Sequence, residues 1–287
     1  MVPMEPSWQE PSAPSGPPQV VWPQLTPMCR RLLILNTVVF LVNFVAYLVK
    51  DHWISASVYN AILRPLELDP AAWREHFPLV PVWQLLTYGF LHSVEDLSHI
   101  VTNMLMLYFM GGMLEEMIGS RRFLITYLAA QLAGALVFLA PVLFGEVSGP
   151  ALGASGAVLG ITVAVATLRP RQTVFLLFIP ITLKVMALGI LAFTVFGWLL
   201  SMKHGSDGVA YLVHLGGIAY GFAAVRTGLI NKDPVVILDR RRAVREVERA
   251  SEDAAKMDQL LDKIHRHGMS SLSHSEKEFL KRVSARK

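Results

Sequence analysis

The sequence predicts an all-α membrane protein with six transmembrane helices and a small helical cytoplasmic tail. Hydrophobic residues make up 53% of the 287-residue chain and charged residues only 17%, which is too apolar for an ordinary water-soluble domain of this length. The apolar residues also form stretches whose lengths are close to that of a helix crossing a bilayer, about 20 residues. The six stretches are residues 32–49, 97–114, 123–144, 151–168, 181–200 and 209–225.

The chain is predicted to have three parts. Residues 1–28 are rich in Pro and Ser, lack Lys and Arg and contain no apolar core, so we expect a disordered segment and no cleavable secretory signal. Residues 29–228 form the predicted membrane domain, and residues 229–287 form the tail. The single cysteine, Cys29, excludes an intrachain disulfide and a multi-cysteine metal site.

Basic residues predict the orientation of the spans, because Lys and Arg accumulate on the cytoplasmic side of a membrane. They flank alternate ends of the predicted helices, so both termini are expected inside and residues 50–96, 145–150 and 201–208 outside. The net charge of +4 suits a face near anionic lipid and gives no indication of nucleic acid binding. The flanking residues are Arg30, Arg31, Arg121, Arg122, Arg169, Arg171, Arg226 and Lys232.

Residues 173–200 are too many for one perpendicular helix, and Pro180 and Lys184 interrupt them. We therefore expect residues 173–179 to form an interfacial lead-in, with the fifth span beginning near Lys184, whose long side chain can reach the membrane surface.

The charged tail predicts a helical hairpin. The first helix is expected to end at His267-Gly268, and Ser273 and Glu276 have the spacing of a capping box that begins a second helix. The apolar residues at helical spacing in the two helices are Met257, Leu260, Leu261, Ile264, Phe279, Leu280 and Val283.

Three polar features lie inside predicted spans, where such side chains need a partner or a function. His99 and Asn103 share one helix face because they are four residues apart; alone, this pattern is typical of helix packing. Ser155 stands among small residues, which alone is typical of helix association. His214, taken alone, fits packing or function equally well.

Together these features predict a catalytic site. All three lie one to two turns inside the same, non-cytoplasmic membrane face, with His214 roughly 9 Å below Gly208. The glycine pairs 156/160 and 217/221 would let the fourth and sixth helices approach backbone to backbone, as a short serine side chain requires. Ser155 would then be a nucleophile activated by His214 as general base. No aspartate lies within the spans, so the site would be a dyad.

Peptide hydrolysis also needs hydrogen-bond donors directed at the developing oxyanion. The side chains of His99 and Asn103 could supply them, together with the backbone N–H of Ser155 at the N-terminal end of its helix.

The sequence resembles a rhomboid intramembrane serine protease, with motifs that follow in the same order from about Trp83 to Gly221. The run Gly153-Ala154-Ser155-Gly156 resembles the nucleophile motif of that family. The other matching segments are His99-x-x-x-Asn103 for the oxyanion pair, His214-Leu215-Gly216-Gly217 for the histidine-glycine motif, residues 83–92 for the end of the large first loop, and residues 111–115 with Gly119 for the cytoplasmic end of the second helix.

The resemblance implies a rhomboid-like bundle of six helices around a water-accessible cavity, without cofactor or metal ion. Its partners would be membrane lipids and single-span membrane proteins, cleaved near the non-cytoplasmic face. The fifth helix would be a lateral gate and residues 203–208 a mobile cap. The tail resembles an extension of some bacterial rhomboids, which implies the bacterial inner membrane; its partner stays open.

Two positions depart from the family pattern. Leu159 stands where several relatives have an aromatic residue stacking on the histidine, so His214 is expected to be held by apolar packing alone. Val213 stands where alanine is usual, beside the tight helix contact. We expect His52, His92 and His204 to be ordinary loop histidines.

Three other functions fit the sequence less well. A catalytically silent rhomboid-like protein that binds membrane clients would typically lack the serine or the histidine, whereas this chain has both. A transporter or channel would be expected to have charged residues along a membrane path or inverted repeats with broken helices. Zinc and aspartyl intramembrane proteases are disfavoured, because H-E-x-x-H and a pair of aspartates within spans are both absent from the sequence.

Overall fold

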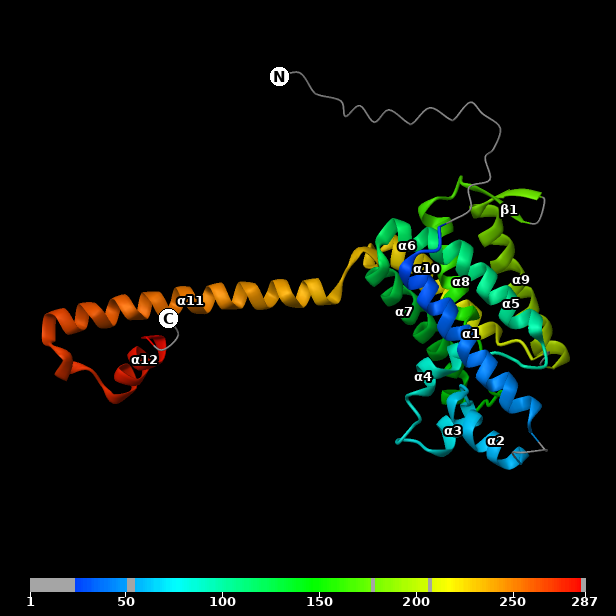
Figure 1. Ribbon diagram of the computed structural model, residues 1–287, viewed down its shortest axis with the longest axis horizontal. Coiled ribbons are helices and arrows are strands. Elements are labelled where there is room, and N and C mark those ends of the chain that lie inside the picture. The colour runs from blue at the N-terminus through cyan, green and yellow to red at the C-terminus, as the bar shows by residue number, and fades with distance from the viewer. Residues whose placement is uncertain (1–23, 51–54, 177–178, 206–207, 285–287) are drawn as a thin grey trace, which may run out of the picture. The chain divides into compact units, whose positions relative to one another are not determined.

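The structure is a computed structural model that describes residues 24–50, 55–176, 179–205 and 208–284. Most of the expected N-terminal segment, His52, and two residues of the expected cap, Ser206 and Asp207, lie outside the described residues. The chain divides into two compact units between Ile230 and Asn231, whereas the sequence placed this boundary between residues 228 and 229. The elements of both units are shown in Figure 1.

The first unit confirms the prediction of an all-α membrane protein. Four helical segments in the described residues are long and apolar enough to cross a membrane: α1 (Pro27–Leu48), Leu97–Ile118, Ser120–Phe144 and α9 (Leu183–His204). The helix α8 (Ser155–Leu168) is apolar but has only 14 residues, and α10 (Tyr211–Arg226) has 16. The count of six spans therefore stays a prediction.

Two of the long segments change helix type along their length. The segment that begins at Leu97 consists of α5 (Leu97–Met106), a π-helical turn η3 (Leu107–Gly111) and α6 (Gly112–Ile118). A π turn frees backbone carbonyl groups from the regular ladder, and here the Cys29 thiol of α1 donates to the Leu107 carbonyl at 3.2 Å. The next segment consists of α7 (Ser120–Leu139) and η4 (Ala140–Phe144).

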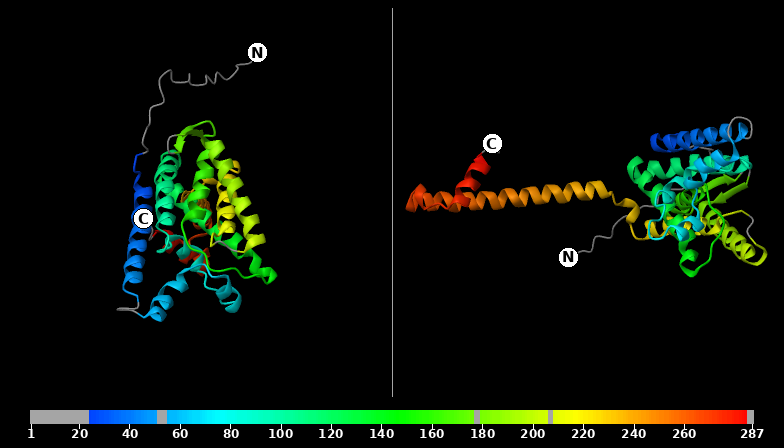
Figure 2. Two further views of the ribbon diagram at one scale, coloured as in Figure 1. Left: turned by 90° about the vertical axis from the view of Figure 1, so that its right-hand side faces the viewer. Right: turned by 90° about the horizontal axis from the view of Figure 1, so that it is seen from below.

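The helices differ in how deeply they lie in the bundle. Helix α10 packs most extensively against α8 and α7, and ten of the 14 residues of α8 are buried. Helix α1 lies along one side of the bundle in both views of Figure 2. In α9 only Leu183, Thr194 and Gly197 are buried, so most of this helix faces outward.

Glycines allow α8 and α10 to touch backbone to backbone, as the sequence predicts. A methyl group on Gly217 would overlap the carbonyl group of Gly156, and one on Gly221 would overlap that of Gly160. A methyl group on Gly160 would lie 2.7 Å from the Gly217 carbonyl oxygen. Small residues permit this approach in membranes, where close van der Waals packing drives helix association.

Glu115 joins three helices at the end of the bundle opposite α2 and α3. Its carboxylate accepts hydrogen bonds from the backbone N–H groups of Met28 at 2.9 Å and Cys29 at 2.7 Å, and from the hydroxyls of Thr26 and Ser120. The carboxylate therefore caps the first turn of α1, where N–H groups have no intrahelical partner. Its side chain is only 3% exposed.

The segment between α1 and α5 folds into short helices instead of an open loop. They are α2 (Ala56–Leu63), η1 (Arg64–Leu66), α3 (Pro70–Glu75), α4 (Gln84–Thr87) and η2 (Tyr88–Phe90). Figure 1 shows α2 and α3 at one end of the bundle and β1 at the other.

A two-stranded antiparallel hairpin precedes α9, where the sequence indicated only an interfacial lead-in. Strand β1 (Thr173–Leu176) pairs with β2 (Ile179–Thr182). Both strands are rich in β-branched residues, which favour strands, and Pro180 is tolerated because a two-stranded hairpin has only edge strands. Helix α9 then begins at Leu183, one residue before Lys184, with the Thr182 hydroxyl accepting from the Val185 N–H.

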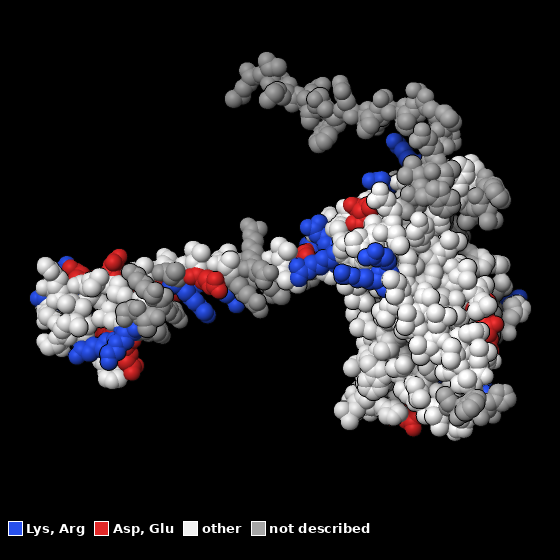
Figure 3. All heavy atoms as spheres, viewed as in Figure 1, with Lys and Arg blue, Asp and Glu red and all other residues white. Residues whose placement is uncertain are grey.

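Charged side chains are sparse on the membrane unit. Figure 3 shows its sides as almost entirely uncharged, with Lys and Arg gathered around the end of the bundle where Figure 1 labels α6. This distribution is expected for a unit whose sides face hydrocarbon.

The second unit is the helical hairpin that the sequence predicts. Helix α11 (Pro234–His267) ends at Gly268, whose φ is 76°, and α12 (His274–Ser284) follows the 3-10 turn η6 (Met269–Ser271). The capping box is present: the Ser273 N–H donates to Glu276 at 2.7 Å, and the Glu276 N–H donates to the Ser273 hydroxyl at 3.3 Å. A small core forms from Leu260, Leu272 and Phe279, with Ile264, Leu280 and Val283 beside it.

Glu115→Gln is expected to lower the free energy of unfolding of the membrane unit by about 2 kcal/mol, because hydrogen bonds to an ionised group are stronger than those to a neutral amide. Thermal unfolding in detergent measures this as a lower melting temperature. Glu116→Gln, at the exposed neighbouring position, is the control, and equal melting temperatures for the two variants would contradict the capping role.

Glu276→Gln is expected to loosen the tail hairpin. Hydrogen bonds from the Lys263 ammonium group at 2.9 and 3.0 Å and from the Ser273 N–H hold the pKa of Glu276 at about 2. Because this pKa lies below its ordinary value of 4.5, the contribution of Glu276 is complete above about pH 4.5 and disappears as the pH falls towards 2.

Amide hydrogen exchange of α12 in the full-length protein at pH 7 measures this effect. We expect faster exchange in Glu276→Gln and unchanged exchange in Glu278→Gln. The Glu278 side chain is exposed, and its Oε1 makes only a long approach of 3.9 Å to Nδ1 of His274, which contributes little at the surface. Equal protection in both variants would show that the capping box does not hold α12.

Candidate active site

Ser155 is the first residue of α8, and the four residues before it are not helical. The sequence placed the start of this span at Ala151, and the difference has a physical reason. The Ala151 N–H and carbonyl group exchange hydrogen bonds of 2.9 and 3.0 Å with Leu68, and the Gly153 N–H donates to the Tyr88 carbonyl at 2.9 Å. These bonds hold residues 151–153 out of the helix, so the serine lies at a helix N-terminus.

The structure brings Ser155 and His214 together. Nε2 of His214 lies 2.8 Å from Oγ of Ser155, within hydrogen-bonding distance. The residues come from α8 and α10, the two helices that touch through their glycines. Both residues are partly exposed. A serine at this distance from an imidazole can pass its proton to the ring as it attacks an electrophile.

An aromatic ring does contact His214, contrary to the expectation of apolar packing alone. The Tyr211 ring, one turn earlier on α10, lies edge-on to the imidazole with 6.3 Å between centroids and an interplanar angle of 85°. Leu159, where the sequence lacks an aromatic residue, is partly buried. The family pattern places the aromatic residue on α8, whereas here the ring lies three residues before His214 on α10 itself, a spacing that could have indicated the contact.

Val213 fits at the helix contact because it faces glycines. Its Cγ1 would lie 2.8 Å from a methyl group on Gly156, and its carbonyl oxygen would lie 2.8 Å from one on Gly134. The larger side chain therefore occupies space that two neighbouring helices leave free, and only 2% of Val213 is exposed.

His99 and Ser155 border the same small space next to Gly153. A methyl group on Gly153 would lie 2.6 Å from Nε2 of His99 and 3.8 Å from Oγ of Ser155. The φ of Gly153 is 124°, a conformation that L side chains rarely adopt. The glycine thus leaves room between the serine oxygen and a ring nitrogen of His99.

Asn103 is hydrogen-bonded to His99 and not to the serine. Its side-chain amide donates to the His99 carbonyl group at 2.8 Å and is buried. Among the described residues it makes no hydrogen bond with Ser155, and its amide instead holds the backbone of His99.

His92 belongs to the surroundings of this site, although the sequence suggested an ordinary loop histidine. It is only 1% exposed, its ring lies 5.2 Å from that of His99, and its Nε2 accepts a long hydrogen bond of 3.5 Å from the Ala154 N–H. Its Nδ1 has no hydrogen-bond partner among the described residues. The sequence indicated a role for His92 only through its position as the last residue of the segment 83–92 that resembles the family.

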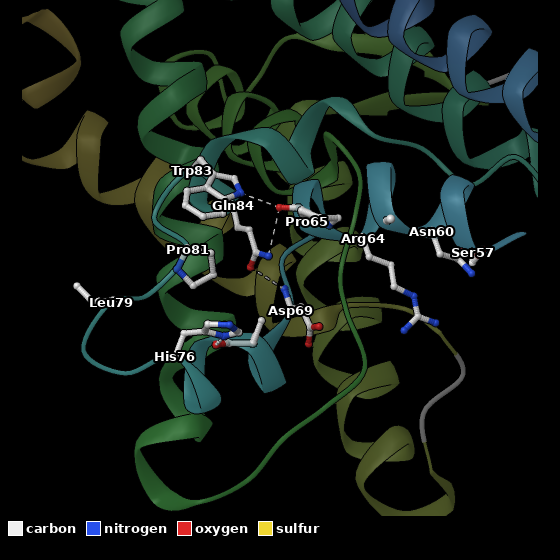
Figure 4. A pocket seen from close by; sticks show the side chains of 12 residues that line it. Ser57, Asn60, Arg64, Pro65, Asp69, His76, Leu79, Pro81, Trp83 and Gln84 are labelled. Carbon is white, nitrogen blue, oxygen red and sulfur yellow. Dashed lines mark hydrogen bonds between the residues drawn. The ribbon is translucent and has the colours of Figure 1, made fainter. Parts of the chain in front are cut away.

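A separate hollow of about 690 Å³ lies between α2, α3 and the segment that leads into α4. Figure 4 shows Gln84 at its floor, bonded to the Asp69 N–H and the Pro65 carbonyl group. None of Ser155, His214, His99 and Asn103 lines it. We therefore assign this hollow to the architecture of the loop, which Gln84 holds together.

Two families match the chain. The rhomboid domain matches residues 81–230, just over half of the chain, and a family of unknown function (DUF6576) matches residues 246–286. The first match covers Ser155, His214, His99 and Asn103, and the second covers most of the tail hairpin.

Three curated relatives illustrate the similarity. RHOMBOID-like protein 12, mitochondrial, of Arabidopsis thaliana is 33% identical over 50% of this chain and 46% of its own length. Presenilin-associated rhomboid-like protein, mitochondrial, of Homo sapiens is 30% identical over 49% and 38%, respectively. Rhomboid protease GluP of Bacillus subtilis is 41% identical over 27% and 14%. The chain thus spans less than half the length of each relative.

Gly153→Ala is expected to slow the reaction of Ser155 with a fluorophosphonate probe by about 10-fold or more. Alanine rarely adopts the φ of 124° found at this position. Its methyl group would also displace His99, and small displacements of groups around a reacting atom lower the reaction rate. Gly149→Ala is the matched control, because Gly149 precedes the same helix and has open space around it. An unchanged labelling rate for Gly153→Ala would show that this space is not used.

Proposed function

The chain belongs to the rhomboid family, and we propose that it is an intramembrane serine endopeptidase with Ser155 as nucleophile and His214 as general base. The observation that carries the proposal is the 2.8 Å distance between Oγ of Ser155 and Nε2 of His214. One relative, from Bacillus subtilis, is named as a rhomboid protease. Together, the family and the distance favour catalysis over a silent client-binding protein.

The proposed reaction follows from the placement of the groups. Oγ of Ser155 attacks the carbonyl carbon of the scissile peptide bond while Nε2 of His214 accepts its proton, which requires a neutral imidazole protonated at Nδ1. The histidine then gives this proton to the leaving amine. Water hydrolyses the resulting acyl-enzyme by the same proton transfers in reverse order.

His99, with the backbone N–H of Ser155, is proposed to stabilise the oxyanion. His99 borders the space beside Gly153, and the N–H group at the first position of α8 has no partner within the helix. Asn103 is proposed to complete the donors, either directly when substrate is bound or by holding the backbone of His99 through its 2.8 Å hydrogen bond.

The proposed substrates are single-span membrane proteins, with cleavage near the non-cytoplasmic face. The outward face of α9 supports access from the lipid, because its large apolar side chains are exposed, among them Phe193 at 72% and Phe196 at 60%. The alternation of basic residues supports cytoplasmic termini. The relatives include mitochondrial proteins and a bacterial one. We therefore propose a membrane protein with both termini on the cytoplasmic or equivalent side, and do not retain the expected bacterial inner membrane.

Cleavage of a labelled single-span substrate by the purified protein in liposomes tests the proposal. Ser155→Ala and His214→Ala are expected to lose at least about 1000-fold in rate. Asn103→Ala is expected to lose about 10- to 1000-fold, as for one oxyanion donor. Ser201→Ala, a serine of α9 whose hydroxyl donates to the Trp198 carbonyl group, should cleave like the wild type.

Equal cleavage by the wild type and Ser155→Ala would refute the proposal. Binding of the substrate by the wild type without any cleavage would favour the client-binding alternative.

A further inference from the structure

We propose that Tyr211 is a positioning residue for His214 and that Gly197 of α9 is the surface against which Tyr211 is held. The alignment of the general base would then depend on α9 lying against α10. This inference rests on the proposed function, and it concerns two residues that the motifs of the sequence do not include.

Tyr211 and His214 lie on one face of α10, because they are three residues apart. Their rings meet edge to face with 6.3 Å between centroids, a geometry that aromatic pairs prefer. Tyr211 is 7% exposed. A buried ring in this position restricts the rotation of the imidazole about its side-chain torsions.

Gly197 provides the other side of the contact. A methyl group on Gly197 would lie 2.5 Å from Cζ and 2.7 Å from Oη of Tyr211, so the phenol ring lies directly over the glycine backbone. Any larger residue at position 197 would push the ring away. Because Tyr211 is rigid beyond its first two torsions, this displacement would be transmitted to the ring edge that faces His214.

The contact is also one of few that hold α9. Its buried residues are Leu183 at the beginning of the helix, and Thr194 and Gly197 one turn apart further along. The Tyr211 ring therefore connects α9, the least buried of the four long membrane helices in the described residues, with the proposed base of the dyad. An outward movement of α9 at Gly197 would remove the support of the ring.

His214 needs such support, because a dyad has no carboxylate to orient its imidazole. Among the described residues, the only hydrogen bond of its ring is the one with Ser155. The T-shaped contact with the Tyr211 ring takes the place of a hydrogen-bonded orienting group.

Four variants and one double variant test this inference. We expect Tyr211→Leu to lower kcat for the membrane substrate and the fluorophosphonate labelling rate by about 10-fold, with KM within about 2-fold of the wild type, because alignment and not binding is lost. Tyr211→Phe retains the ring and should keep at least about a third of the wild-type rate. Gly197→Ala should behave like Tyr211→Leu.

Gly189→Ala is the matched control on the same helix, since a methyl group there meets nothing within 4 Å; it should match the wild type. The double variant Gly197→Ala/Tyr211→Leu separates positioning from a general packing defect. If Gly197 acts through Tyr211, the double variant is no slower than Tyr211→Leu alone, whereas independent packing defects multiply. Melting temperatures in detergent identify any variant that fails to fold, and the comparison of Leu with Phe at position 211 then decides.

Equal kcat values for Tyr211→Leu and the wild type, or equal losses in Tyr211→Leu and Tyr211→Phe, would overturn the inference. A loss in Tyr211→Leu that appears only in KM would also overturn it. Failure of the proposed function is distinguishable, because the wild type would then not cleave the substrate in a Ser155-dependent manner.

Discussion

The backbone contact between α8 and α10 is the constraint on which the rest of the site depends. Serine has one of the shortest reactive side chains, so its hydroxyl reaches an imidazole on another helix only if the two backbones nearly touch. Gly156, Gly160, Gly217 and Gly221 make this possible, because a single methyl group at 217 or 221 would overlap a carbonyl group of the facing helix. The 2.8 Å distance between Ser155 and His214 is the result.

Two further sets of hydrogen bonds fix the beginnings of helices in this bundle, one at α8 and one at α1 and α7. On the side of the site, Leu68 and Tyr88 of the folded loop bind the backbone of Ala151 and Gly153, and the Tyr88 hydroxyl donates to the Gln131 carbonyl group of α7 at 2.8 Å. At the other end, Glu115 caps α1 and binds Ser120 of α7. Buried backbone groups need partners, so these bonds determine where the helices begin.

The bundle combines deeply buried helices with helices that are largely exposed on one side. Helices α7, α8 and α10 share an interior with many buried small residues, whereas in α9 only Leu183, Thr194 and Gly197 are buried. A closely packed interior suits the proposed nucleophile and base, whose distance must be kept, and an exposed helix suits the side from which the proposed membrane substrate would approach. Tyr211 lies where these two parts meet, which makes it the point at which movement of α9 can reach the chemistry.

The sequence by itself determined the elements that depend on local composition and spacing. Apolar stretches gave the positions of the long membrane helices, the glycine pairs gave the contact of α8 with α10, and Ser273 with Glu276 gave the cap of α12. These features could be predicted because each leaves a local pattern: the small residues four apart in each glycine pair mark a helix face that permits close approach, although the pattern does not name the facing helix.

The tertiary structure alone decided the features that join distant residues. Helix α8 begins at Ser155 because loop residues more than 60 positions earlier bind the preceding backbone, and the β hairpin replaced an expected lead-in by pairing two short segments. The burial of His92, the packing of the Tyr211 ring on Gly197 and the fit of Val213 against Gly134 and Gly156 likewise depend on contacts between separate helices and loops. Spacing along one chain carries no information on such contacts, because they are fixed only when the backbones pack and the hydrogen bonds of each buried end find their partners.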